Sequence, residues 1–348
     1  MKKLTFVAGC LLAIQASASF AASIDLSSYS LVGRYDLPDP SKVAAPANNL
    51  LAQEASGITY NWDTDTLFII GDGSTSITQV SKTGQLIDVM TLAQQAGNPQ
   101  GTAFYDAEGI TYIGNGQFVF TEERLRVANL VTYAAGTTIG YNDAQHVKLG
   151  TTVGNVGLEG LTYDPKTGGY IFAKEINPQG LFQTTLDFTN GTASNGSAAT
   201  VNSVNLFDPA LLGVGDIADV FALSNLTNLI GALSDNLIVV SQESARLVET
   251  DRSGNVLSTF NLSTLLTGSD SLSAQDMQFE GITMDRQGYI YLTTENGGGD
   301  ISKPQMFVLA PRSPLGAVPE PATWAMMIGG LALTGATLRR RQARVRFA

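Results

Sequence analysis

The chain has 348 residues, of which 44% are hydrophobic, so it can bury a sizeable core. That length allows two or three domains, although all-β propellers of this size often form a single one. Cys10 is its only cysteine and His146 its only histidine. Once residues 1–22 are removed, as predicted below, disulfides and thiolate sites are excluded. Histidine-dependent catalysis would rest on His146 alone, which lies in a predicted strand and is interpreted as structural.

The charge of the chain excludes nucleic acid as a partner. The sequence has 20 Lys and Arg against 31 Asp and Glu. Seven of the basic residues and one acidic residue lie in the two end segments, 1–22 and 318–348, so residues 23–317 carry 13 basic and 30 acidic side chains and a net charge of −17. A body with this charge repels nucleic acid and anionic lipid and attracts cations.

Residues 1–22 are predicted to be a secretory signal peptide. Lys2 and Lys3 precede a largely apolar stretch over 4–14, and small residues follow at 17–22 (SASFAA), which predicts cleavage after Ala22. A rival interpretation takes 7–10 (VAGC) as a lipoprotein box around Cys10. It leaves only about six residues for an apolar run that usually spans roughly 7–15, which favours the ordinary signal peptide.

A short phrase recurs through residues 23–317. It reads EASGITY at 54–60, DAEGITY at 106–112, GLEGLTY at 157–163 and QFEGITM at 278–284, with a degraded copy, DVFAL, at 219–223. Aligning Gly57, Gly109, Gly160, Ala222 and Gly281 gives spacings of 52, 51, 62 and 59 residues. This alignment places Phe221 where glutamate is expected. Periods of this size indicate propellers or solenoids.

Each copy is followed by a turn and a second, more continuously apolar strand. These second strands are predicted at 67–70, 118–120, 170–173, 237–240 and 289–292, and their Ile, Val, Phe and Tyr content fits strands packed on both faces. Third and fourth strands follow, as at 77–81 and 86–92. Frequent Gly and Asn argue against helices of ordinary length. Four antiparallel strands repeated five times predict an all-β fold, a single β-propeller over residues 23–317.

The ring is predicted to close through the N-terminal strand. In the last unit, no further strand is predicted after residues 305–309. Residues 30–37 have the pattern of a strand but precede the first unit and belong to none. Pairing the two would close the ring and remove an exposed edge. We therefore predict five blades, with six as the alternative.

Residues 318–348 resemble a PEP-CTERM sorting signal. They contain PEP at 319–321, an uncharged apolar run of 17 residues at 322–338, and then Arg339, Arg340 and Arg341. The run is at the short end for a transmembrane segment, and a plain tail anchor or a buried core helix are the alternatives. The resemblance implies export through the inner membrane of a Gram-negative bacterium that makes exopolysaccharide, and processing by an exosortase. The protein would then reside in the periplasm, at the cell surface or in the medium.

The body resembles the SdiA-regulated family, which is akin to phytase-like and esterase-like propellers. The resemblance is carried by DAEGITY at 106–112 with TEER at 121–124, GLEG at 157–160 with AKE at 173–175, SQESAR at 241–246 with ETD at 249–251, and QFEG at 278–281 with TE at 294–295. It covers about residues 27–311. It implies a propeller outside the cytoplasm and a divalent cation, without a settled activity.

Acidic residues occur at two places in the repeat that should meet on one face. The first strand of a propeller blade lines the central channel and the second runs antiparallel beside it, so the start of one and the end of the other lie together. We expect a divalent cation, preferably calcium, to be bound by residues from these two places: Glu108, Glu159, Glu280, Asp72, Glu122, Glu175, Glu243 and Glu295. Their registers differ by one or two positions, and a slip of one reverses a side chain, so not every one can point inward. A solvated acidic rim, or glutamates that cap backbone amides, are the alternatives.

Two functions fit this sequence. The first is a calcium-stabilised propeller that binds a glycan such as exopolysaccharide, a peptide or another envelope partner. The alternative is a calcium-dependent hydrolase of phosphoester, ester or lactone bonds with a glutamate as general base. Few basic residues lie near the acidic phrases (Arg124, Arg126, Lys174 and Arg246), and no nucleophile-elbow, phosphate-loop or dinucleotide motif is present, which favours the binding module.

Overall fold

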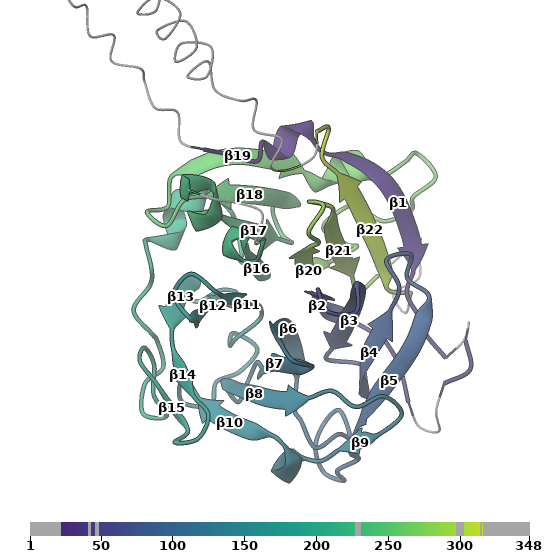
Figure 1. Ribbon diagram of the computed structural model, residues 1–348, viewed down its shortest axis with the longest axis vertical. Coiled ribbons are helices and arrows are strands. Elements are labelled where there is room, and N and C mark those ends of the chain that lie inside the picture. Colours follow the sequence, from purple (N-terminus) through teal and green to yellow (C-terminus); the bar gives the residue numbers. More distant parts are fainter. Residues whose placement is uncertain are drawn as a thin grey trace, which may run out of the picture.

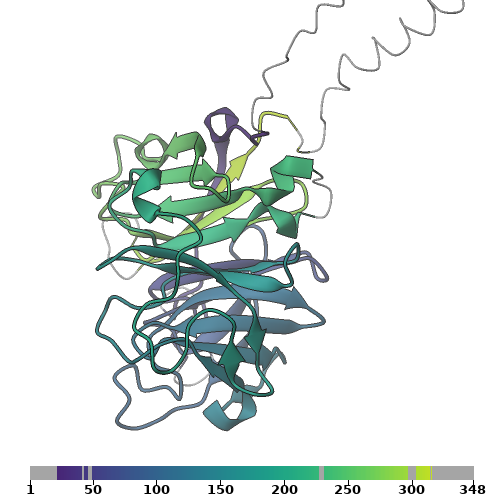
Figure 2. The same ribbon diagram turned by 90° about the vertical axis from the view of Figure 1, so that its left-hand side faces the viewer.

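The computed structural model describes residues 22–40, 43–45, 49–226, 231–296, 303–313 and 315. In this part of the chain, five β-sheets surround a central channel as the blades of a propeller (Figure 1). Viewed edge-on, the strands cross the short dimension of the ring (Figure 2). The prediction of a single five-bladed β-propeller is confirmed, and the six-bladed alternative is wrong.

The blades share one strand order from the channel outward. The innermost strands are β2 (Ala55–Asn61), β6 (Ala107–Gly114), β11 (Leu161–Asp164), β16 (Asp219–Ala222) and β20 (Phe279–Met284). The second strands are β3 (Thr66–Gly71), β7 (Gln117–Glu122), β12 (Gly169–Lys174), β17 (Leu237–Ser241) and β21 (Ile290–Thr294). The third strands are β4 (Ser76–Val80), β8 (Val127–Thr132), β13 (Gly180–Thr184), β18 (Arg246–Thr250) and β22 (Gln305–Ala310).

The outer strands differ most between the blades. They are β5 (Leu86–Leu92), β10 (Gln145–Lys148), β19 (Val256–Asn261) and, in the last blade, β1 (Ser30–Asp36). The sheet of blade three has three strands, and β14 (Leu186–Asp187) and β15 (Thr192–Ala193) form a separate ribbon, while β9 (Thr138–Ile139) adds to β5 in parallel. The expectation of four strands therefore holds in four blades but not in blade three. Short 3₁₀ turns complete the fold: η1 (Leu26–Ser28), η2 (Tyr141–Asp143), η3 (Pro209–Leu212), η4 (Leu223–Asn225), η5 (Gly231–Asp235) and η6 (Leu262–Leu265).

The N-terminal strand closes the ring, as predicted from the sequence. β1 pairs antiparallel with β22, from Ser30 opposite Ala310 to Asp36 opposite Gln305. Just upstream, the backbone N–H of Ile24 donates to the Glu249 carboxylate at 3.0 Å, and the Ser23 hydroxyl donates to the same carboxylate at 2.5 Å. The segment before β1 is thus attached to blade four, and β1 itself covers the edge of blade five.

Hydrogen bonds between neighbouring blades reveal the true register of blade four. The backbone N–H groups of Tyr112 and Tyr163 donate to the hydroxyls of Thr59 and Thr111 in the preceding blades, each at 2.9 Å. In blade four the same bond runs from the Ala222 N–H to the hydroxyl of Thr162 at 3.2 Å. Ala222 is therefore the equivalent of these tyrosines, not of the repeat glycine.

The alignment of the degraded phrase was therefore wrong by three residues. Asp219 occupies the glycine position, Ala218 that of glutamate, and Phe221 that of threonine. At the other copies glycine is needed because the next blade is close: a Cβ on Gly57 would lie 2.3 Å from the Glu108 carbonyl oxygen. In blade four the Asp219 carboxylate instead accepts the Ile282 N–H of blade five at 2.9 Å, so a side chain makes the contact between blades.

The core consists of apolar layers between adjacent blades. Phe68 of β3 packs against Phe118 of β7 with ring centroids 4.5 Å apart, and Tyr112 of β6 lies 4.9 Å from Phe118. The second strands are buried along most of their length, as their continuous apolar pattern predicts. These layers hold each first strand against its neighbours around the channel.

The two predicted end signals fall outside this description. The signal peptide, residues 1–22, lies outside the described residues except for Ala22, and so does the sorting signal, residues 318–348, with its apolar run at 322–338. Among the helices of the described residues, none has the length and apolar character needed to cross a membrane.

Candidate functional site

One end of the central channel opens into a cavity of about 340 Å³ lined by carboxylates. Every blade contributes at two places: the first strand or the one or two residues before it, and the residue directly after the second strand. The first set is Ser56, Glu108, Glu159, Ala218 and Glu280, and the second is Asp72, Glu123, Glu175, Gln242 and Glu295. Arg124, Asn155 and Gln278 complete the lining. Seven carboxylates thus face a single cationic side chain. We call this space the acidic cavity.

In blades one, two and five, bulges at the starts of the first strands turn these side chains toward the cavity. Between Ala55 and Gly57 the pairing of β2 with β3 shifts by one residue, which leaves Ser56 unpaired. Glu280 is skipped in the same way between β20 and β21, and β6 shifts at the corresponding place. A bulge inserts one residue and re-aims a side chain, which is why it is common beside functional sites. Just upstream, Glu54, Asp106 and Gln278 have left-handed backbones with φ of 48°, 62° and 54°.

Six of the eight predicted ligands line the acidic cavity. They are Asp72, Glu108, Glu159, Glu175, Glu280 and Glu295. Glu122 does not, because it is the last residue of β7, and its fully buried carboxylate accepts the Tyr105 N–H at 2.7 Å and an Asn129 amide at 3.2 Å. It caps a backbone amide, one of the alternatives weighed from the sequence. Glu243 is exposed and lies one residue beyond Gln242, which takes the position in the lining.

Glu122 and Glu243 each lie one residue away from the position that lines the cavity. A shift of one residue along a strand reverses the direction of the side chain. The predicted ligand set contained Glu122 and left out its neighbour Glu123, which is the one that lines the cavity. The signal that finds it is the position directly after each second strand, shared by Asp72, Glu175, Gln242 and Glu295. Without the strand ends, the two adjacent glutamates in TEER could not be told apart.

Burial and mutual repulsion keep protons on several of these carboxylates. Burial raises the pKa of Glu108, Glu159 and Glu280 well above the usual value, and neighbouring carboxylates raise it further. Burial likewise raises the pKa of Asp72 to about 6 and that of Glu123 and Glu295 to about 7. Arg124 is the one basic side chain among the described residues of the lining, so most of these carboxyl groups have no basic side chain to neutralise them.

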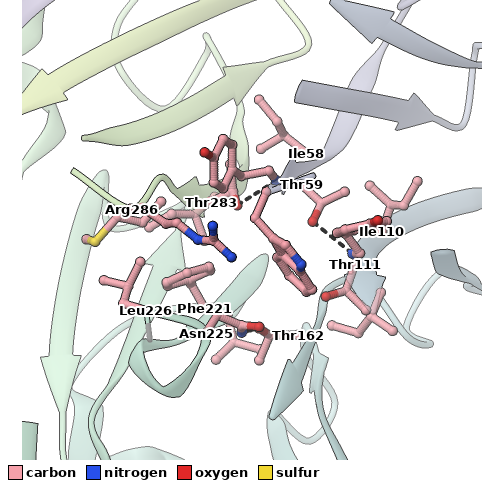
Figure 3. Close-up of a pocket in the computed structure, with 17 residues that line it drawn as sticks. Ile58, Thr59, Ile110, Thr111, Thr162, Phe221, Asn225, Leu226, Thr283 and Arg286 are labelled. Atoms are coloured by element: carbon pink, nitrogen blue, oxygen red, sulfur yellow. Dashed lines mark hydrogen bonds between the residues drawn. The ribbon is translucent and has the colours of Figure 1, made fainter. Parts of the chain in front are cut away.

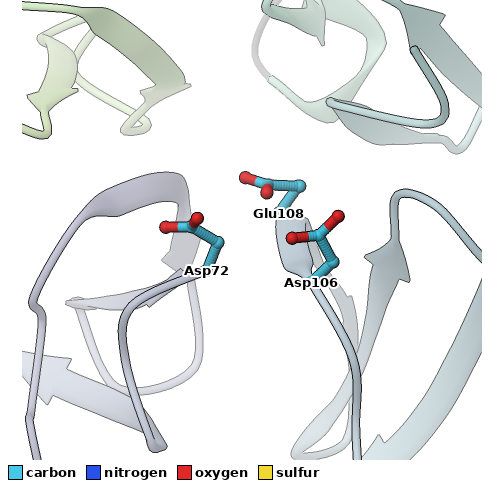
Figure 4. Close-up of side chains that lie close together, drawn as sticks. All are labelled: Asp72, Asp106 and Glu108. Carbon is cyan, nitrogen blue, oxygen red and sulfur yellow. The ribbon is translucent and has the colours of Figure 1, made fainter. Parts of the chain in front are cut away.

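The closest group of carboxylates consists of Asp72, Asp106 and Glu108 (Figure 4). One oxygen atom from each lies within 4.8 Å of the other two. Asp106 is also held by the Arg124 Nε at 2.7 Å and by the Gln100 amide at 2.9 Å. The Oδ1 atom of Asp72 is buried without a hydrogen-bond partner. Oxygen atoms in such a cluster are suited to a hard cation, since calcium takes oxygen ligands in flexible geometry.

A second, smaller cavity lies among the first strands, and its lining differs in chemical character from that of the acidic cavity. It has a volume of about 20 Å³ and is lined mainly by apolar side chains and threonines, such as Ile58, Thr111 and Phe221, together with Asn225 and Arg286 (Figure 3). The hydroxyls of Thr59 and Thr111 accept backbone N–H groups of the next blades. These groups hold the blades together and leave little space for a ligand.

His146 has a structural environment, as interpreted from the sequence. Its ring stacks on Tyr141 with centroids 3.8 Å apart, and its two nitrogens lie 2.6 Å from the Asn129 amide oxygen and 2.9 Å from the Tyr141 carbonyl. It is not part of the acidic cavity.

Comparison with known proteins identifies two segments. The family described as SdiA-regulated matches residues 41–297, and the PEP-CTERM protein-sorting motif matches residues 317–341.

Among solved structures, virginiamycin B lyase from Staphylococcus aureus is similar at 13% identity, over 79% of this chain and 69% of that one, with a TM-score of 0.37. Glutaminyl cyclase from Myxococcus xanthus is similar at 13% identity, over 81% and 96%, with a TM-score of 0.43. A luciferin-regenerating enzyme is similar at 11% identity, over 74% and 91%, with a TM-score of 0.43. At these values none of the three activities is transferred to this chain.

Proposed function

We propose that this chain, which belongs to the SdiA-regulated family, binds a divalent cation, preferably calcium, in the acidic cavity and serves as a binding module of the cell envelope. The observation that carries the proposal is the convergence of seven carboxylates with Arg124 as the only basic side chain of the lining. Carboxylates gathered in this way cannot all ionise unless a positive charge compensates them. A bound cation would supply that charge.

The residues present fit a hard cation. Asp72, Asp106 and Glu108 would be its first ligands, because one oxygen atom from each lies within 4.8 Å of the other two and Asp72 Oδ1 lacks a hydrogen-bond partner. Glu280 and Glu159 approach the same space from other blades. No histidine or cysteine belongs to the described lining, which supports calcium over zinc.

The side chains around the proposed cation site are suited to an oxygen-rich ligand. Asn155, Gln242 and Gln278 place amides at the cavity beside the carboxylates. Amides both donate and accept hydrogen bonds, which suits a polyhydroxylated partner. The PEP-CTERM motif at residues 317–341 implies processing by an exosortase and is consistent with export. An envelope glycan such as exopolysaccharide is therefore the ligand that we favour.

A hydrolase remains the second candidate because of one observation. Burial raises the pKa of Glu123 to about 7, and this carboxylate lies 3.7 Å from Arg124 Nε. A carboxylate that titrates near neutral pH is suited to act as a general base. Purified protein should be screened against phosphomonoester, ester and lactone substrates, with and without calcium. Turnover that requires calcium and is lost in Glu123→Gln would establish the hydrolase.

Calcium titration tests the main proposal. The mature protein should be melted in chelator, in millimolar calcium and in millimolar magnesium, and calcium binding should be measured by calorimetry. A cation that binds only the folded state stabilises it by about 2.7 kcal/mol at a hundredfold excess over its dissociation constant. Calcium should therefore raise the melting temperature clearly above that in chelator. Identical melting in calcium and in chelator, with no heat of binding, would contradict the proposal.

A further inference from the structure

Among the described residues, Arg126 is a fully buried cation whose side chain has no hydrogen-bond partner. It stands in the turn between β7 and β8, has 0% exposure and is among the largest fully buried side chains described. Its Nε, Nη1 and Nη2 atoms all lack a hydrogen-bond partner. A guanidinium stays protonated in proteins, and a buried charge that nothing compensates is strongly unfavourable. Burial lowers the pKa of Arg126, and no carboxylate offsets the effect.

The backbone of Arg126 is fixed by the turn, and its guanidinium packs against Gly150. The Arg126 N–H donates to the Glu123 carbonyl at 3.0 Å, and its own carbonyl accepts the Leu149 N–H at 2.8 Å. The backbone at Arg126 is left-handed, with a φ of 55°. Gly150 packs directly against the guanidinium, because a Cβ there would lie 2.3 Å from Arg126 Nε. A glycine at this position gives the guanidinium room inside the protein.

Arg126 borders a pocket of about 210 Å³ between blades two and three. Its other polar lining residues are Lys174, Gln179, Asn202, Ser203 and Asn205, and none of the described residues that line it is acidic. Lys174 is 5% exposed, and its Nζ donates to the carbonyls of Ile176 and Pro178. The Ser203 hydroxyl is buried without a hydrogen-bond partner. We call this space the Arg126 pocket.

We infer that the Arg126 pocket binds a small oxyanion group, either a carboxylate or a tetrahedral phosphate or sulfate. The planar guanidinium matches two oxygens of such a group at once, and Lys174 has a third N–H beyond the two that its carbonyl partners use. The Ser203 hydroxyl provides a further donor. Two cations and an unsatisfied hydroxyl, without an acidic neighbour among the described residues of the lining, are complementary to an anion.

The Arg126 pocket is separate from the acidic cavity but adjacent along the chain. Glu123 and Arg126 lie at opposite ends of the turn between β7 and β8, and Lys174 at the end of β12 directly precedes Glu175, so adjacent residues line the two spaces. An envelope ligand that carries acidic groups could therefore use both spaces. The inference about the Arg126 pocket does not depend on the cation, and its test is carried out in chelator.

Melting and calorimetry in chelator test the inference. Phosphate, sulfate, acetate and glucuronate are compared with chloride at constant ionic strength. At least one oxyanion should raise the melting temperature in a saturable way, with measurable heat of binding. A response to phosphate or sulfate alone assigns a tetrahedral anion, and one to acetate and glucuronate assigns a carboxylate. If no oxyanion differs from chloride, the inference is overturned.

Variants connect the response to the pocket. Arg126→Met should abolish it and should not lower the melting temperature in chloride, because an apolar side chain replaces an uncompensated buried charge. Arg246→Met, at an exposed arginine of β18, is the matched control and should keep the response. If Arg126→Met does not fold, Ser203→Ala decides: an oxyanion dissociation constant about fivefold weaker supports the pocket, since one hydrogen bond contributes about 1 kcal/mol. Unchanged affinity in Ser203→Ala, or an undiminished response in Arg126→Met, overturns it.

Discussion

Glu280 and Glu295 are hydrogen-bonded to each other at the acidic cavity, from the first strand and the end of the second strand of blade five. Two carboxyl groups can share a hydrogen bond only when one of them is protonated. Burial raises the pKa of Glu295 to about 7 and that of Glu280 well above the usual value, so Glu280 keeps the proton. Glu159 and Glu123 form the same kind of pair between blades three and two. In each pair a cation could replace the shared proton.

Replacing Glu280 by glutamine should separate cation binding from folding. Glutamine resembles the protonated acid, so Glu280→Gln should melt close to the unmodified protein in chelator. Its calcium affinity should fall by about tenfold, which corresponds to about 1.4 kcal/mol, because a charged ligand is lost. Glu243→Gln is the matched control, since Glu243 is exposed and does not line the cavity. Calorimetric titration of both variants checks the prediction, and equal affinities would contradict the placement of the cation.

The stability of the cation-free protein should fall as pH rises from about 4.5 to 7. The ordinary pKa is 3.8 for Asp72 and 4.5 for Glu123 and Glu295, whereas in the folded protein these groups titrate at about 6, 7 and 7. In that window the folded state holds protons that the unfolded state has released, so raising the pH favours unfolding. His146, whose pKa burial lowers, acts in the opposite sense but is a single group.

Calcium should reverse this pH dependence. Binding displaces the stored protons, so calcium affinity should increase with pH over the same window. Melting in chelator at a series of pH values, and calcium calorimetry in buffers of different ionisation enthalpy, measure the two effects. A melting temperature in chelator that rises steadily from pH 5 to 7 would show that the carboxylates are not protonated in the folded state.

Glu122 should matter for stability and not for calcium. Its buried carboxylate accepts the Tyr105 N–H at 2.7 Å and an Asn129 amide at 3.2 Å. Glu122→Ala leaves both donors without this acceptor, which should lower the free energy of unfolding by roughly 1–3 kcal/mol. Calcium affinity, measured below the melting temperature, should stay within about twofold of the unmodified protein, since the expected loss for a removed ligand is about tenfold. A large loss of calcium affinity in Glu122→Ala would indicate that Glu122 is a ligand of the cation after all.

The fold was predictable because its signals are periodic and local. The repeated glycine phrase and the apolar second strands predicted the blades. The additional strand pattern at 30–37 predicted how the ring closes. The register of blade four was not predictable, because Asp219 replaces the glycine and makes its contact through a side chain. The choice between Glu122 and Glu123 was not predictable either, because the exact strand ends and bulges determine which of two neighbouring residues faces the channel. Arg126 lies in a turn outside the repeat phrase, and its isolation is visible only in three dimensions.

Export should remove both ends of the chain. The sequence predicts a mature start near Ser23, and the PEP-CTERM motif at residues 317–341 implies cleavage by an exosortase, which we expect close to residues 319–321. Intact-mass analysis of the protein recovered from its host should show both losses. Persistence of the C-terminus through Ala348 would point to a plain tail anchor instead.

The N-terminal strand should hold the whole ring together. β1 forms six residue pairs with β22, and Arg34 reaches Asp270 in an ion pair of 2.7 Å. Deleting residues 23–38 would expose the edge of blade five and leave Glu249 without its contacts to Ser23 and Ile24. Backbone hydrogen bonds contribute about 0.5–1.5 kcal/mol each, so the loss should reach several kcal/mol.

Thermal melting of the truncated protein should therefore show unfolding of the entire propeller at a lower temperature, with no separate transition for a frayed end. Arg34→Met is the matched control, because it keeps β1 and removes only side-chain contacts of Arg34: the ion pair to Asp270, the hydrogen bond to Gln305 and the contact with the Phe307 ring. A partly exposed ion pair contributes about 0–1 kcal/mol and a cation–π contact about 0.5–1 kcal/mol, so this variant should melt well above the truncated protein. If the truncated protein melts at the same temperature as the intact one, β1 merely covers the last blade and the ring is closed by the packing of its first strands alone.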